Sequence, residues 1–131
     1  MPVDAEDAAP REGCGLPRDA RITASAEIRA LFRRGKRRKT RHLDAFVSAS
    51  PAAFPRLGVV VPKHRHEIVE RNRVKRRLRE IGRTVVLPGL RNSGVAVDVL
   101  LRARPEAYLA PFGDLRDDLR ALTEELCSRA P

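Results

Sequence analysis

The sequence lacks the features that would place it in a membrane or among disulfide-stabilised secreted proteins. No run of apolar residues approaches the length that a membrane-spanning helix needs. The acidic N-terminus has neither the cationic start nor the apolar core of a secretory signal, so we expect none. Cys14 and Cys127 are the only cysteines, and they lie near opposite ends of the chain without metal-ligand spacing. A disulfide is possible in principle, but two free thiols in a cytoplasmic protein are the favoured interpretation.

A recognisable catalytic constellation is also missing. The basic region contains no paired carboxylates, and no glycine-rich phosphate loop precedes a helix. His64 and His66 form a short pair, but no third ligand lies at a useful spacing, so we favour solvated or phosphate-facing imidazoles over a metal site. Cys14 lies in a segment that we expect to be disordered, which makes it a poor nucleophile. We therefore predict no catalytic residue and no metal ligand in this chain.

Acidic residues are scarce in one part of the chain, and cations are plentiful there. The formal net charge is +10, and residues 33–83 contain 17 Lys or Arg against 4 Asp or Glu. The rest of the chain contains 10 cations and 13 acids. A basic region of this kind indicates nucleic acid as the first candidate partner and an anionic membrane surface as the second.

The centre of the basic region is the stretch 71–80, in which cations surround a regular apolar pattern. Val74, Leu78, Ile81 and Val85 recur at the spacing of one helix face. On that helix, the side chains that point away are Asn72, Arg76, Arg79 and Arg83, flanked by Arg71 and Lys75 on one side and by Arg73 and Arg77 on the other. We expect Glu80 to form a salt bridge with Arg76 on the same helix. A cationic surface held in fixed geometry by a buried stripe suits a polyphosphate backbone.

The remaining pattern predicts one folded domain over residues 16–127, between a disordered arm (1–15) and a short tail (128–131). We expect a helix over Ala24–Arg34, a mobile basic loop over Arg33–Arg41, strands over Leu43–Ala49, Leu57–Val61 and Val95–Leu101, the basic helix from about Ile68, and a last helix from about Pro111. The almost wholly apolar strand at 57–61 should be central, and Pro88-Gly89 and residues 92–94 should break the chain. This order predicts a two-layer or three-layer α/β sandwich.

Phe46 is the residue whose environment the alternation leaves open. In the strand 43–49 it shares a face with Asp44 and Ser48, opposite the apolar set. Either helices cover both faces of the sheet and Phe46 packs under one of them, or Phe46 lines a groove.

Several motifs resemble the protein component family of bacterial ribonuclease P. The most specific is Arg71-Asn72-Arg73-Val74-Lys75-Arg76-x-x-Arg79-Glu80, and others are Phe32-x-x-Gly35-Lys36-Arg37, Arg56-Leu57-Gly58-Val59-Val60-Val61-x-Lys63 and Arg102-x-Arg104-Pro105. The ordering matches over roughly residues 16–127. The resemblance implies an α+β two-layer sandwich like a ribosomal-protein domain, with four strands and three helices in the order αβββαβα. It also implies a left-handed βαβ crossover, which handedness rules alone would not predict.

The resemblance further implies a protein that is not itself the catalyst. In that family an RNA subunit, with Mg²⁺, removes the 5′ leader of precursor tRNA, and the protein binds both RNAs. Carried over by position, the RNA-binding residues would be Arg71, Asn72, Arg73, Lys75, Arg76, Arg79, Lys63 and Arg37, and the leader groove would be lined by Phe32, Phe46 and Ile28. The resemblance thus favours the groove for Phe46. We expect no activity from the protein alone, a monomer in the absence of RNA, and no membrane partner.

The chain departs from the family pattern just before the basic helix. Where relatives usually read Ser-Lys-Lys-x-Gly, it reads Pro62-Lys63-His64-Arg65-His66, which indicates a different turn and a contact at His64 that depends on pH. Ile28 stands at a position that is often aromatic, which would leave an apolar wall in place of a stacking platform.

The alternative function is a ribosomal-type structural RNA-binding protein. A DNA-binding module is disfavoured because the cationic helix has no companion helix in a helix-turn-helix arrangement. An autonomous nuclease is disfavoured because no acidic metal cluster accompanies the basic surface.

Overall fold

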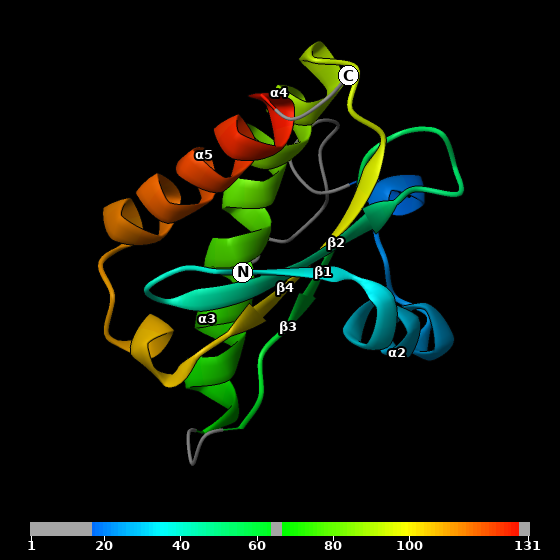
Figure 1. Ribbon diagram of the computed structural model, residues 1–131. Coiled ribbons are helices and arrows are strands. Elements are labelled where there is room, and N and C mark those ends of the chain that lie inside the picture. Colours follow the sequence, from blue (N-terminus) through cyan, green and yellow to red (C-terminus); the bar gives the residue numbers. More distant parts are fainter. Residues whose placement is uncertain (1–16, 64–66, 129–131) are drawn as a thin grey trace.

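The computed structural model describes residues 17–63 and 67–128, which form a four-stranded mixed sheet with helices on both faces (Figure 1). The strands are β1 (Lys36–Lys39), β2 (Leu43–Ala49), β3 (Arg56–Val60) and β4 (Val97–Ala103), in the spatial order β1-β2-β4-β3. β1 and β4 both pair antiparallel with β2, whereas β3 pairs parallel with β4. The parallel pair requires a crossover, which the helices between β3 and β4 provide.

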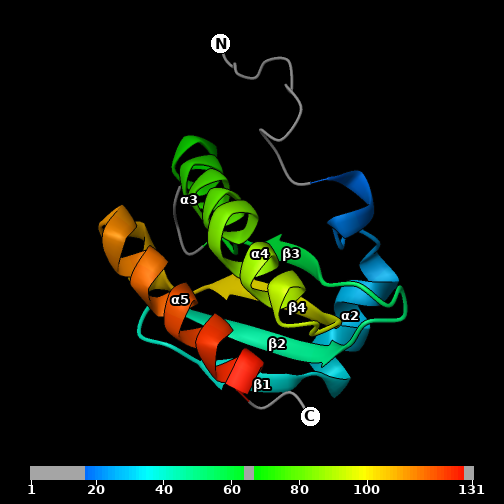
Figure 2. The same ribbon diagram turned by 90° about the horizontal axis from the view of Figure 1, so that it is seen from above.

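The longer helices are α2 (Ser25–Arg34), α3 (Ile68–Ile81) and α5 (Phe112–Ser128). After α3 the chain stays helical through a π-helical turn, η2 (Gly82–Val86), and a short helix, α4 (Leu87–Asn92). Two 3₁₀ turns, η1 (Arg18–Ala20) and η3 (Pro105–Tyr108), complete the fold. In Figure 2, α3, α4 and α5 lie together over one face of the sheet. The predicted order of helix, three strands, helix, strand and helix is confirmed.

Each face of the sheet carries its own apolar cluster. The larger one joins alternate residues of β2, β3 and β4 to α3, α4 and α5, with Leu78, Leu101 and Leu115 among its fully buried members. The smaller one lies on the other side and contains Ile22, Leu31, Phe46 and Leu100. We call this side the α2 face, because Leu31 of α2 packs there. Both faces of the sheet are therefore covered, at least in part, which is the reason for apolar residues at successive positions of the strands.

Three expectations about the elements were wrong. Residues 36–39 are not a mobile loop but the edge strand β1, because each of them pairs with a residue of β2. The strand at 57–61 is not central: β3 is the other edge, and it is apolar on both sides because both sheet faces are covered. Pro88-Gly89 does not break the chain, since a proline is tolerated in the first turn of α4, directly after the π-helical turn.

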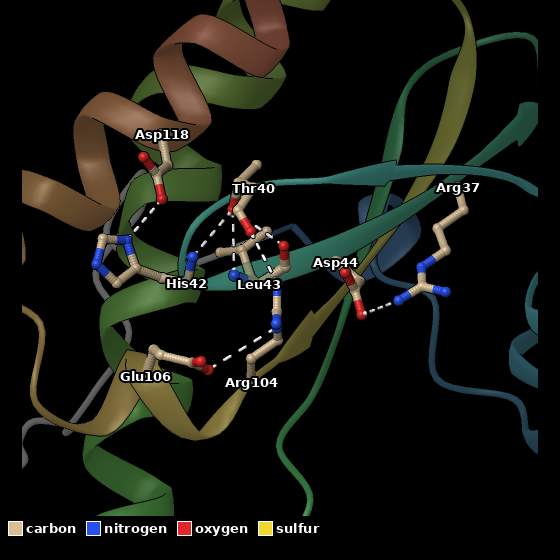
Figure 3. Close-up of polar contacts among 8 residues, drawn as sticks. All are labelled: Arg37, Thr40, His42, Leu43, Asp44, Arg104, Glu106 and Asp118. Atoms are coloured by element: carbon tan, nitrogen blue, oxygen red, sulfur yellow. Dashed lines mark hydrogen bonds and ion pairs between the residues drawn. The ribbon is translucent and has the colours of Figure 1, made fainter.

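Polar contacts hold the basic β1–β2 hairpin in place (Figure 3). The backbone N–H of Leu43 donates to Thr40 Oγ1 over 3.1 Å, which closes the turn. His42 Nδ1 lies 2.7 Å from Asp118 Oδ2 on α5, and Arg104 Nη1 donates to the Thr40 carbonyl over 3.2 Å. The hairpin is thus tied to the end of β4 and to α5, which gives the neighbouring cations of β1 fixed positions.

Gly35 ends α2 by a close approach rather than by a left-handed conformation. Its φ is −67°, and its N–H donates to the Leu31 carbonyl over 2.8 Å. A Cβ at this position would lie 2.6 Å from that carbonyl oxygen and 3.2 Å from Phe46 Cβ. Glycine is therefore required because α2 turns directly into β1 against β2.

Cys127 is a free, half-buried thiol whose Sγ lies 3.5 Å from the Gly89 carbonyl oxygen. Cys14, His64 and His66 lie outside the described residues. Over the ranges 17–63 and 67–128, the chain has no helix of the length and apolarity that a membrane crossing requires.

Candidate nucleic-acid interface

α3 presents a cationic surface opposite its buried stripe. Val74, Leu78 and Ile81 are at most 1% exposed, as the helical spacing predicts. Its exposed residues include Asn72, Arg73, Arg76 and Arg79, which we call the arginine face of α3. Because the stripe fixes the rotation of the helix, it also fixes the direction in which these side chains leave it. The predicted one-sided array of guanidinium groups is therefore present.

The start of α3 is defined by a reciprocal cap. The Glu67 side chain accepts from the backbone of Glu70, and Glu70 Oε1 accepts from the Glu67 N–H over 3.1 Å. Such a capping box satisfies two donors that a helix start otherwise leaves unpaired. It thereby holds the first turn of α3 in place, directly before the arginine face.

Some cations around the face are bound by the protein itself. Arg71 Nε and Nη2 each lie 3.4 Å from the Val61 carbonyl, and Arg77 Nη1 donates to the Ala110 carbonyl over 3.3 Å. Within the described part of the chain, no hydrogen bond or ion pair involves the side chains of Arg73 and Arg76. The helix thus has tethered arginines at its flanks and available ones on its exposed side.

The expected Glu80–Arg76 salt bridge was wrong. Glu80 instead binds Arg83, with Oε2 2.6 Å from Nη2. A carboxylate that precedes its cation by three residues is the favoured orientation on a helix, because it also suits the helix dipole. Arg76 consequently keeps its charge available.

On the α2 face, the strand register gathers three more cations. Arg37 lies opposite Phe46, and Asp44 lies between Lys39 of β1 and Arg102 of β4. Residues directly opposite each other share a face of the sheet, so Arg37, Lys39 and Arg102 all belong to the side on which Phe46 lies. All three are exposed. Arg37 Nη2 donates to Asp44 Oδ2 over 3.1 Å, as Figure 3 shows.

The three residues predicted for the leader groove belong to one small cluster. Phe32 and Phe46 meet edge to face with ring centroids 5.0 Å apart, and the Arg102 guanidinium lies 5.7 Å from the Phe32 centroid. Phe46 is only 8% exposed, whereas Phe32 and Ile28 are half-buried. Phe46 therefore packs beneath α2 and supports Phe32, and Phe32 carries the more accessible ring.

An ion-pair network fixes α2 on the sheet. Arg56 donates to both carboxylate oxygens of Asp98, over 2.9 and 2.7 Å, and to Glu27 Oε2 on α2 over 3.1 Å. The hydrogen bond with Asp98 raises the pKa of Arg56 above its ordinary value, so Arg56 remains charged. This network joins β3, β4 and α2, and it thereby sets where the Phe32 ring stands.

The remaining predicted residues lie beside these surfaces. Lys63 is exposed after β3, and Lys75 is half-buried on α3. The alternation along β4 could have assigned Arg102 to the face of Phe46, but in the sequence it was noted only as part of the Arg102-x-Arg104-Pro105 motif. Arg21, which lies close to Arg79, gave no signal in the sequence, because it belongs to a short segment without periodicity. In residues 17–63 and 67–128, no three or more His, Cys, Asp or Glu side chains are grouped as a metal site would require.

Comparisons with known proteins show the family to which this chain is similar. The family model of Ribonuclease P matches residues 16–127. The chain is 37% identical over 106 residues to the ribonuclease P protein component of Kocuria rhizophila, covering 81% of this chain and 90% of the relative. It is 41% identical over 111 residues to that of Micrococcus luteus, covering 77% and 83%.

Solved structures show the same fold at lower identity. The ribonuclease P protein of Staphylococcus aureus superposes with a TM-score of 0.66 at 22% identity, over 81% of this chain and 94% of that one. The protein from Thermotoga maritima gives a TM-score of 0.66 at 23% identity, over 80% and 96%. With a family model that spans nearly all of the described residues, the chain belongs to the ribonuclease P protein family.

Proposed function

We propose that this chain, as the protein component of ribonuclease P, binds two RNAs through two surfaces. The arginine face of α3 contacts the catalytic RNA, and the α2 face of the sheet holds the 5′ leader of precursor tRNA. The catalytic RNA, with Mg²⁺, hydrolyses the phosphodiester bond, and the protein contributes binding and orientation. The observation that carries the proposal is the array of exposed guanidinium groups, which the buried stripe of α3 holds in one direction.

Leader binding is supported by the chemistry of the α2 face. A half-buried phenylalanine ring offers a π-face to any base, and stacking of this kind contributes about 1–3 kcal/mol per base without demanding a sequence. Arg102 lies over that ring, and Arg37 and Lys39 are on the same face of the sheet, so the three cations can neutralise a passing backbone. Phe46 supports the Phe32 ring, and Ile28 forms an apolar wall of the groove. Such a site suits a leader whose sequence differs from one tRNA to the next.

The direct test is reconstitution with the catalytic RNA. We expect the protein alone to leave precursor tRNA uncut, and the protein with the RNA to release the leader at a low Mg²⁺ concentration at which the RNA alone is slow. Cleavage by the purified protein without RNA would overturn the proposal. We expect the free protein to be cytoplasmic and monomeric, and sedimentation of the RNA-free protein can check that it is a monomer.

Arg76→Ala tests the arginine face of α3. Removing one phosphate contact should reduce the slope of log affinity for the catalytic RNA against log salt by roughly 0.7–0.9. Arg120→Ala is the matched control, because Arg120 is an exposed arginine on another helix, α5. Equal slopes for wild type and Arg76→Ala would remove Arg76 from the interface.

Phe32→Ala tests the leader groove. In the reconstituted enzyme, the variant should weaken binding of leader-bearing precursor by about 1–3 kcal/mol, with little effect on mature tRNA. Phe112→Ala is the control, since Phe112 is a partly exposed phenylalanine at the start of α5. Equal losses for precursor and mature tRNA would favour a structural RNA-binding role without leader recognition.

A further inference from the structure

The chain before α2 is fastened to the outer edge of β3. The Ile22 N–H donates to the Leu57 carbonyl over 2.9 Å, and Arg21 forms a parallel bridge with Leu57. A Cβ on Gly58 would lie 3.0 Å from the Ile22 carbonyl oxygen and 2.9 Å from Leu100 Cδ1, so the absence of a side chain lets this segment come close. In Figure 2 the blue N-terminal residues and β3 lie along the same edge of the sheet. Arg21 is therefore held at a fixed position although it lies outside the regular strands.

A recess of about 170 Å³ lies between this segment, α2, β3 and α3. Its apolar lining includes Ile22, Ile28 and Leu57, and Arg21 and Arg79 contribute guanidinium groups from two separate elements. The volume is several times the ~30 Å³ that one water takes up in the liquid. The recess can therefore admit part of a nucleotide rather than a single water.

The electrostatics of the recess favour an anion. The pKa of Arg79 is lowered from its ordinary value, first by burial and then by the positive charge of Arg21. Two guanidinium groups that repel each other across a cavity gain from an anion placed between them. Their planar forks suit the non-bridging oxygens of a phosphate, and each can donate two hydrogen bonds to it.

The position of the recess connects the two proposed RNA surfaces. Arg79 belongs to the arginine face of α3, and Ile28 lines the proposed leader groove on α2. The recess lies beside β3, which is the edge strand between them. An RNA strand that leaves one surface and passes round this edge would meet the recess on its way.

We propose that Arg21 and Arg79 together bind one backbone phosphate of an RNA strand at the β3 edge, with the adjoining ribose against Ile22 and Ile28. This inference rests on the proposed function, because Arg79 is shared with the arginine face of α3. The new element is a third contact, supplied by a residue before α2. It joins the two RNA-binding surfaces into one continuous path.

The test compares Arg21→Ala, Arg79→Ala and the double variant, with Arg18→Ala as the matched control. Arg18 is an exposed arginine in η1, in the same segment but outside the recess. Arg21 and Arg79 are themselves exposed enough that the variants should fold, which their thermal unfolding midpoints would verify. Arg21→Lys keeps the charge and removes the fork, so it should keep the salt slope while losing part of the affinity.

We expect Arg21→Ala to weaken RNA binding about tenfold at low salt, and Arg18→Ala to leave it unchanged. For the double variant, the slope of log affinity against log salt should be smaller by roughly 0.7–0.9, which corresponds to one phosphate. A loss twice as large would mean two separate phosphates and would overturn the shared site. Two arms identify the strand: titration with the catalytic RNA, and binding of precursor against mature tRNA by the reconstituted enzyme.

If Arg21→Ala weakens binding of the catalytic RNA, the phosphate belongs to the catalytic RNA. If Arg21→Ala weakens binding of precursor tRNA but not of mature tRNA, the phosphate belongs to the leader. An Arg21→Ala variant that matches wild type in both arms would overturn the inference. Arg76→Ala distinguishes failure of the proposed function from failure of the inference about the recess. If Arg76→Ala weakens binding of the catalytic RNA while Arg21→Ala does not, the proposed function stands and only the inference about the recess fails.

Discussion

Breaking the Arg56 network should cost this domain a large part of its stability. The change is Arg56→Met, which keeps an unbranched apolar stem and removes the guanidinium. In the wild-type protein that group makes two hydrogen bonds to Asp98 and one to Glu27. The Arg56 and Asp98 side chains are only 12% and 8% exposed, so Asp98 would lose its partner while it stays largely shielded from solvent.

The expected magnitude follows from which groups remain buried. An ion left buried without its partner typically costs about 3–5 kcal/mol. Glu27 is 40% exposed, and an ion pair screened to that degree contributes at most about 1 kcal/mol. Since a domain of this size is stable by roughly 5–15 kcal/mol, Arg56→Met should remain folded but shift markedly toward the unfolded state.

The assay is urea denaturation, with the free energy of unfolding extrapolated from the midpoint and the slope. Glu27→Gln should fall within about 1 kcal/mol of wild type. The double variant Arg56→Met/Asp98→Val should recover most of the loss, because replacing both members of a buried pair by apolar groups is often neutral. If Arg56→Met cost less than about 1 kcal/mol, or if the double variant were no more stable than Arg56→Met, the account of Asp98 as a buried, partner-dependent carboxylate would be refuted.

Two further predictions concern stability. Gly35→Ala should destabilise the protein by about 1–3 kcal/mol in urea denaturation, because the new Cβ meets the Leu31 carbonyl; Gly113→Ala, whose Cβ has only one distant contact at 3.8 Å, should be neutral or stabilising by up to about 1 kcal/mol. An equal effect at both positions would contradict the close approach at Gly35. Burial raises the pKa of Tyr108 above 10.0 in the folded state. The contribution of the neutral Tyr108 phenol to the free energy of unfolding is therefore complete below pH 10, and it is lost as the pH rises through the raised folded-state pKa. Tyr108→Phe lacks the hydrogen bond to the Pro62 carbonyl and should be about 1 kcal/mol less stable at pH 8, with a gap to wild type that narrows toward pH 11 in urea unfolding; a constant gap would contradict this.

The elements that the sequence predicted correctly are those with a strong period. Val74, Leu78 and Ile81 repeat at helical spacing and are buried, and β2 runs from Leu43 to Ala49 as its alternation indicates. The elements that it predicted wrongly depend on neighbours that a local pattern does not contain. Charge alone made residues 36–39 resemble a loop, but their pairing with β2 makes them a strand.

The same limit applies to the candidate site. Exposure of the arginine face of α3 follows from the buried stripe, and it was therefore predictable. The tethers of Arg71 and Arg77 were not, because their acceptors are backbone carbonyls at Val61 and Ala110, which any residue would supply. Glu80 had cations on both sides within reach, and the choice of Arg83 over Arg76 needs helix geometry beyond simple spacing.

The two outermost strands have a consequence for the protein before it meets RNA. A free strand edge invites a second polypeptide to add to the sheet, and such addition leads to aggregation. Here β1 is made only of lysine and arginine, so two copies that approached along it would repel each other, and the segment at Arg21 already bonds to β3 on the opposite side. The charges that attract an RNA partner thus also keep newly made chains apart from one another until that partner is available.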